Sequence, residues 1–243
     1  MKRVVLLAGL AIMLCAAAPV DRALLAGELA ALSEAGNGEA TYHLAMMKHL
    51  GIGGPKDEKT AFDLFRKSAE AGDPLGAYKL GCYYAGQGEA IVEPDPALAL
   101  QYKLVAAEAG YALAQHDVAK HYFDAGETDL ALEWLTRSAG QGFGDALRAL
   151  ASLHNSDAIP KDAARTYAYF TLYLARIATP TDKQKQFLAD FTDKMSEADK
   201  ARGDRIVADW HAEASPLTVK ALSGLRAAEA LVDLHLEVKG DVI

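Results

Sequence analysis

Small and aliphatic residues recur along this chain at a spacing that predicts repeated helices. Four glycines, each closing an alanine-rich stretch, stand 36, 38 and 32 residues apart: Gly36, Gly72, Gly110 and Gly142. A small residue follows each glycine by four positions and an aliphatic residue follows by eight: Ala40, Gly76, Ala114 and Ala146, then Leu44, Leu80, Val118 and Leu150. Because positions four apart share one helix face, each glycine is expected to precede a helix. The interval between glycines is typical of a solenoid.

A second helix is predicted ahead of each of the later glycines. Alanines stand eleven and three positions before the glycine, and a bulky residue stands eight before it: Ala61, Ala99 and Ala131; Ala69, Ala107 and Ala139; Leu64, Tyr102 and Trp134. Two helix starts carry an aspartate followed by proline, at Asp73-Pro74 and Asp95-Pro96, which suits the N-cap and the first helical position. Each unit is therefore predicted to be two antiparallel helices whose small residues allow close packing.

The second unit carries the residues of a known repeat. Its two helices, "DPLGAYKLGCYYAGQG" and "DPALALQYKLVAAEAG", resemble the Sel-one-like repeat, a relative of the tetratricopeptide repeat. The first unit matches nearly as well, the third lacks the Gly-x-Gly loop, and the fourth is degenerate, so about four units extend over residues 38–178. The resemblance implies an all-α fold: a right-handed α-solenoid superhelix of antiparallel helix pairs with helical caps.

The segments around the repeats are expected to cap them. Residues 18–37 are interpreted as an N-terminal capping helix and residues 179–215 as C-terminal capping helices. Residues 216–243 are interpreted as an additional amphipathic helix, which is either an extra cap or an element that binds a partner.

The first 17 residues have the layout of a secretory signal peptide. Lys2 and Arg3 precede an apolar run of eleven residues, small residues follow, and cleavage is expected after Ala17. A lipid anchor at Cys15 is the less favoured alternative. Removal of this segment leaves Cys82 as the single cysteine, so no internal disulfide can form. The expected location is periplasmic or secreted.

Composition and charge limit the kinds of molecule that this chain is expected to bind. The chain of 243 residues has a formal net charge of -8 and is 51% hydrophobic. Nucleic-acid binding requires clustered Lys and Arg, and no basic run occurs beyond Lys2-Arg3, so no nucleic-acid partner is expected. No apolar run in the expected mature chain is long enough to span a bilayer. The expected partner is a protein or peptide, and the pattern leaves the oligomeric state open.

Patterns that would indicate catalysis or a bound cofactor are weak. The glycine-rich segments at residues 51–54 and 86–88 lack the Lys-Ser/Thr of a phosphate loop and are interpreted as turns between helices. Neighbouring histidines are five or six positions apart, which is not the spacing that places two metal ligands on one helix face. No Ser-His-Asp, Cys-His or paired-carboxylate arrangement is recognisable. We expect no metal, no cofactor and no catalytic residue.

The predicted partner-binding surface lies on the first helix of each unit. Positions opposite its buried stripe, which line the concave groove of tetratricopeptide-like superhelices, hold aromatic, Met and His side chains. Such residues are favoured at binding surfaces. With two flanking charged residues, the candidates are Tyr42, Met46, His49, Tyr78, Lys79, Cys82, His116, Asp117, Lys120 and Phe123.

The resemblance implies an exported scaffold for protein–protein interaction in the bacterial envelope, acting as an adaptor or regulator. An alternative is an envelope-acting hydrolase of the penicillin-binding or β-lactamase type, which some relatives resemble. This chain lacks the disulfide framework of those relatives, so we do not expect an enzyme.

Overall fold

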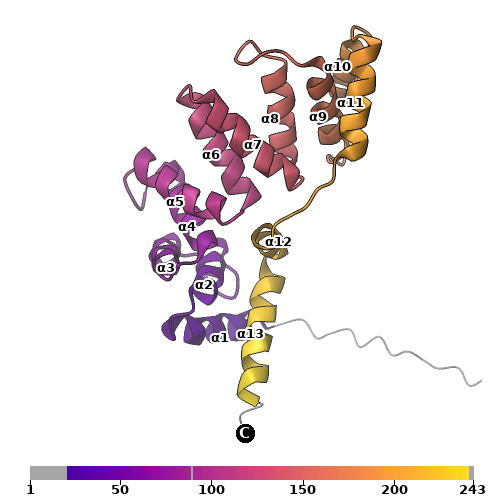
Figure 1. Ribbon diagram of the computed structural model, residues 1–243. Helices are drawn as coiled ribbons and strands as arrows, with labels where there is room; N and C mark the ends of the chain where they lie inside the picture. The colour runs from indigo at the N-terminus through magenta and orange to yellow at the C-terminus, as the bar shows by residue number, and fades with distance from the viewer. Residues whose placement is uncertain (1–20, 89, 241–243) are drawn as a thin grey trace, which may run out of the picture.

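The computed structural model describes residues 21–88 and 90–240, and every regular element in them is helical (Figure 1). The helices are α1 (Arg22–Glu34), α2 (Gly38–Leu50), α3 (Glu58–Glu70), α4 (Pro74–Cys82), α5 (Pro96–Glu108), α6 (Ala112–Asp124), α7 (Thr128–Gly140), α8 (Gly144–His154), α9 (Ala163–Leu174), α10 (Asp182–Thr192), α11 (Glu197–Asp209), α12 (Pro216–Ser223) and α13 (Leu225–Gly240). A π-helical turn, Tyr83–Gln87, follows α4. The predicted all-α fold is confirmed. The predicted signal peptide, residues 1–17, lies outside the described residues.

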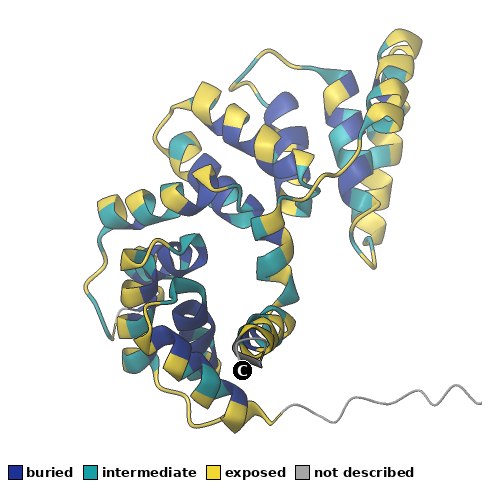
Figure 2. Cartoon of the chain, turned by 60° about the horizontal axis from the view of Figure 1, so that its bottom comes forward, coloured by how far each residue is buried: buried dark blue, intermediate teal, exposed yellow. Residues whose placement is uncertain are grey.

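Helices α2 to α9 form four antiparallel hairpins that stack in chain order: α2–α3, α4–α5, α6–α7 and α8–α9. Helix α1 packs on α2 at one end, and α10 and α11 pack on α9 at the other. The stack curves into an arc (Figures 1 and 2). We call α2, α4, α6 and α8 the first-helix layer, and α10 lies beside α8 at its end.

The turns between units have the backbone that the sequence predicts. Gly72 and Gly110 have φ of 85° and 95°, the left-handed region that glycine adopts without a steric cost. The Asp73 carboxylate accepts a hydrogen bond of 2.7 Å from the N–H of Gly76 and so caps α4. Asp95 caps α5 in the same way. Local sequence therefore sets where each hairpin begins.

Small residues lie where the helices approach most closely. A Cβ on Gly76 would collide with the Ser68 hydroxyl, so no larger residue fits there. That hydroxyl donates a hydrogen bond of 2.8 Å to the carbonyl of Gly38. In the third unit, Ser138 donates one of 2.7 Å to the carbonyl of Ala112. In both units, the serine four positions before the closing glycine thus joins the second helix of the unit to the N-terminus of the first helix.

The C-terminal segment returns to the repeats. The single helix expected over residues 216–243 is instead two helices, because Gly224, with φ of 56°, ends α12 before α13 begins. We call α12 and α13, with the capping residue Ser215, the C-terminal strap. The strap lies across the open side of the arc (Figure 2). Ala228 and Val232 of α13 are buried against Leu25 and Leu29 of α1.

Hydrogen bonds fix the first turn of the strap to the turns between units. The Ser215 hydroxyl donates to the carbonyl of Gly110 at 2.7 Å. The Thr218 hydroxyl accepts from the N–H of Ala112 at 3.0 Å and lies 2.7 Å from Oε1 of Gln141. Helix α6 has no cap from its own N-cap side chain, so Thr218 supplies one from 106 residues away.

Replacing Thr218 with Val is expected to lower the free energy of unfolding by about 1–3 kcal/mol. The variant keeps the side-chain shape but leaves the buried N–H of Ala112 without an acceptor. Thr136→Val is the matched control, because the Thr136 hydroxyl is exposed and bonds only within α7. Urea unfolding followed by circular dichroism measures both. Equal midpoints would contradict the docking of the strap.

Replacing Trp134 with Ala is expected to lower the free energy of unfolding by about 3–5 kcal/mol. The indole is buried in a core cluster that extends from the second to the fourth unit. Leu130→Ala on the same helix removes a side chain that is 39% exposed, so its effect should not exceed about 1 kcal/mol. Urea unfolding compares the two variants. Similar losses in the free energy of unfolding would contradict the role of Trp134 in packing neighbouring units together.

Candidate functional site

The ten predicted residues fall into three groups along the first-helix layer. Tyr42, Met46 and His49 lie on α2, Tyr78, Lys79 and Cys82 on α4, and His116, Asp117, Lys120 and Phe123 on α6. The structure covers the first two groups to a large extent and leaves most of the third open.

Two members of the first group, Tyr42 and Met46, face the strap. Tyr42 is buried in a cluster that includes Leu217 and Ala221 of α12, and burial raises the pKa of its hydroxyl. Tyr42 and Met46 line a small cavity of about 90 Å³ whose far wall is Ala221 and its neighbours in the strap. Nδ1 of His49 is 3.0 Å from the Tyr83 hydroxyl, and partial burial lowers the pKa of the imidazole. The strap therefore occupies the surface that α2 was expected to offer to a partner.

The second group forms a half-buried polar cluster with the next helices. The Tyr78 hydroxyl donates to Oδ2 of Asp117 at 3.3 Å, and Nζ of Lys103 is 2.7 Å from the same oxygen. Burial raises the pKa of Asp117, but His116 and Lys103 together outweigh it and hold the pKa below its ordinary value. Burial raises the pKa of the Cys82 thiol. This cluster joins α4, α5 and α6.

The sequence places Tyr42, Tyr78 and Cys82 on a face opposite the buried stripe, and the structure corrects this. Their exposed fractions are 9%, 8% and 3%. Tyr42 is covered by the strap, and the Tyr78 ring packs edge-on against Tyr111 of the next unit at 5.0 Å between centroids. Lys79 is half-buried, with its ammonium 5.9 Å from the ring centroid of Phe65 on α3. Sequence reasoning missed Lys103, because nothing in the repeat pattern distinguishes it from a solvated lysine.

The third group lines an open cavity between α6 and α8. His116, Lys120 and Phe123 face Arg148 and Ser152 across about 380 Å³. The Phe123 ring is 47% exposed although it is fully apolar. Asp117, the fourth member, turns away to Lys103 and borders a separate hollow beside α5.

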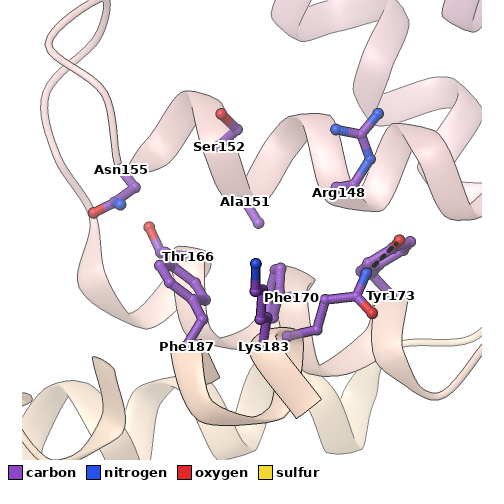
Figure 3. A pocket seen from close by; sticks show the side chains of 10 residues that line it. Arg148, Ala151, Ser152, Asn155, Thr166, Phe170, Tyr173, Lys183 and Phe187 are labelled. Carbon is purple, nitrogen blue, oxygen red and sulfur yellow. Dashed lines mark hydrogen bonds between the residues drawn. The ribbon is translucent and has the colours of Figure 1, made fainter. Parts of the chain in front are cut away.

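A second cavity lies on the other side of α8, against α9 and α10. It holds about 430 Å³ and is lined by Arg148 and Ser152 with Phe170, Lys183 and Phe187 (Figure 3). The two phenylalanine rings meet edge-on at 4.9 Å between centroids. Sequence reasoning missed this cavity, because α9 belongs to the degenerate fourth unit and α10 was interpreted as part of the C-terminal cap. The signal in the sequence that could have identified it is Phe187, an aromatic residue directly after the polar run of residues 182–186.

The two cavities adjoin along one helix. Arg148 and Ser152 line both of them, so we name the combined surface the α8 groove, defined by the lining residues of the two cavities. Lys120, Arg148 and Lys183 border it, and none of its described lining residues carries a carboxylate. This composition is unusual on a chain with 33 acidic and 25 basic residues. The α8 groove offers apolar hollows framed by positive charge.

Among the described residues we find neither a metal site nor a membrane-spanning helix. No group of three or more His, Cys, Asp or Glu side chains within residues 21–88 and 90–240 is placed to hold a metal ion. Among the helices described, none is both long and apolar enough to cross a membrane. Nε2 of His43 and Nδ1 of His154 are buried without a hydrogen-bond partner, and neither lines the α8 groove.

Comparison with known proteins places this arrangement in a family. The Sel1 repeat model matches three consecutive segments of the chain, residues 38–73, 74–111 and 112–143. No curated protein matches the sequence.

Solved structures with a similar fold are distant in sequence. A Sel1 repeat protein from Oxalobacter formigenes is 20% identical, with 79% of this chain and 80% of that chain covered and a TM-score of 0.61. An immunity protein from Pseudomonas aeruginosa is 21% identical over 76% of this chain and 73% of that one, with a TM-score of 0.45. A protective antigen of uropathogenic Escherichia coli with an SLR fold is 16% identical over 84% and 59%, with a TM-score of 0.39.

At such identities a similar structure indicates the fold alone, and the first of these shares the stacked hairpins described above. The repeat boundaries found by the family model coincide with the glycine-marked turns at residues 72–74 and 110–112. Residues 38–143 of this chain are therefore three consecutive Sel1 repeats.

Proposed function

We propose that this protein is an exported scaffold that binds a segment of another protein in the α8 groove. The observation that carries the proposal is the unequal covering of the first-helix layer. Helix α2 is covered by the strap, whereas α6, α8 and α10 border two adjoining cavities that no described residue fills. Binding sites are typically concave and mostly apolar with a few polar groups, which matches the lining of the α8 groove.

The repeat fold supports a protein partner. A solenoid presents an extended surface built from successive units, so a partner can contact several helices at once. Phe123 and Phe187, on opposite sides of α8, are 47% and 42% exposed. Aromatic residues, Phe included, are enriched at protein interfaces, where a few residues supply most of the binding energy.

The proposed setting is the bacterial envelope, where the protein acts as an adaptor or regulator. The N-terminal pattern of Lys2 and Arg3 followed by an apolar run supports export. The single cysteine of the expected mature chain also suits an oxidising compartment, because no mispaired disulfide can form within it.

Replacing Leu7 with Glu is expected to abolish export, because a charge interrupts the apolar run that the secretion machinery recognises. Cell fractionation of a bacterium that expresses the full chain measures this, and mass spectrometry of the exported protein should give a new N-terminus after Ala17. Val20→Glu, beyond the expected cleavage point, is the control. An uncleaved chain in the cytoplasm would contradict the proposed location.

A photo-crosslinking amino acid at Ser152 is expected to give a discrete protein adduct in the envelope fraction, because Ser152 lines both cavities. The same amino acid at Thr136, exposed on α7, is the control. Phe187→Ala in the Ser152-labelled protein should reduce the adduct several-fold. Equal adducts at the two positions would contradict the site, and turnover of a penicillin analogue that depends on Ser152 would favour the hydrolase instead.

A further inference from the structure

We propose that the α8 groove recognises an acidic polypeptide segment that carries two bulky apolar side chains, one for each cavity. This inference rests on the proposed function and adds the chemical class of the partner. Three features of the described residues support this inference. They are the basic side chains that line the groove, the weak ion pairs that these side chains form in the free protein, and the apolar surface between them.

The charged side chains that line the groove are all basic. Arg148 stands at the junction of the two cavities, with Lys120 on the α6 side and Lys183 on the α10 side. No aspartate or glutamate is among the described lining residues of either cavity, although acidic residues outnumber basic ones in the chain by 33 to 25. A local positive potential on a negatively charged protein attracts an anionic segment and repels a basic one.

These cations are available to a partner. Arg148 lies 3.5 Å from Asp145, and both side chains are more than half exposed. Lys120 lies 2.7 Å from Asp124, again with both side chains exposed. Exposed pairs of this kind contribute little to stability, so a partner carboxylate can replace either acid at little cost. Within residues 21–88 and 90–240, Asp182 on α10 pairs with Lys185, at 3.8 Å, and not with the groove residue Lys183.

The cavities between the cations suit apolar side chains. Leu135 and Phe123 line one cavity, and Phe170 and Phe187 line the other. Their volumes of about 380 and 430 Å³ fall in the range of ligand-binding hollows. A helix with its side chains is roughly 10 Å across. In an extended segment of the polyproline II type, which has about three residues per turn and a rise of about 3.1 Å per residue, side chains three residues apart share one face and are about 9 Å apart, so they can enter on both sides of α8.

The apolar lining distinguishes this surface from a nucleic-acid site. Three cations spaced across two hydrophobic hollows do not form a track for a phosphate backbone, and the net charge of -8 repels a long polyanion. A peptide supplies carboxylates and apolar side chains together. The groove therefore favours an acidic segment of a protein.

Fluorescence polarisation of the exported form of the chain tests the partner class with synthetic peptides. The probe is a fluorescein-labelled peptide, EDFEDFEE, and the matched peptides are KKFKKFKK, EDAEDAEE and an oligothymidylate of similar length. We expect EDFEDFEE to bind at least tenfold more tightly than each of the others. Its affinity should fall several-fold between 50 and 200 mM NaCl, because salt screens the charges.

Arg148→Glu should weaken binding of EDFEDFEE at least tenfold. Arg66→Glu is the matched control, because Arg66 forms an equally exposed i,i+3 pair with Asp63 on α3, away from the groove. Its affinity should stay within twofold of the original. If Arg148→Glu lowers the melting temperature, Lys183→Glu, on a different helix, replaces it with the same expectation.

Tighter binding of the lysine peptide or of the oligothymidylate would overturn the proposal, and so would equal effects of Arg148→Glu and Arg66→Glu. These outcomes are separate from failure of the proposed function. A Ser152 adduct that persists while the acidic peptide does not bind overturns the partner class but keeps the groove as the interaction site. Absence of both overturns the function as well.

Discussion

Every feature of this molecule depends on how closely its helices can approach one another. Gly76 has no room for a Cβ because the Ser68 hydroxyl occupies that space, and the same hydroxyl bonds back to the first residue of α2. The equivalent bond from Ser138 to Ala112 repeats the arrangement in the third unit. These contacts hold the two helices of a unit in register, and each hairpin then provides the packing surface for the next. The first-helix layer, and any groove along it, exists only because this spacing is kept.

The strap packs against one end of the first-helix layer and leaves the other end open. Thr218 caps α6, Lys220 lies 2.6 Å from Glu39 of α2, and Val232 is buried on α1. One segment near the C-terminus thus holds together helices that are otherwise far apart along the stack. It also covers Tyr42 on α2, whereas the α8 groove stays uncovered.

Local chemistry could be predicted from the sequence, and long-range contacts could not. The glycine turns and the Asp73 and Asp95 caps involve residues within a few positions of each other, and they lie where the pattern predicts. Burial of Tyr42 and Cys82 depends on elements that the repeat pattern does not describe, the strap for one and the neighbouring unit for the other. The cavity beside α10 was missed for a related reason, since the fourth unit departs from the repeat and its aromatic residues follow no column.

Amide hydrogen exchange of the full chain, followed by mass spectrometry, tests most directly whether the strap is part of the fold. Helix α12 has eight residues, too few to be stable in water without tertiary contacts. We predict that amides of residues 216–223 exchange slowly, at rates similar to those of α6, to which Thr218 is hydrogen-bonded. Exchange of residues 216–223 at the rate of an unfolded peptide, with α6 still protected, would contradict it.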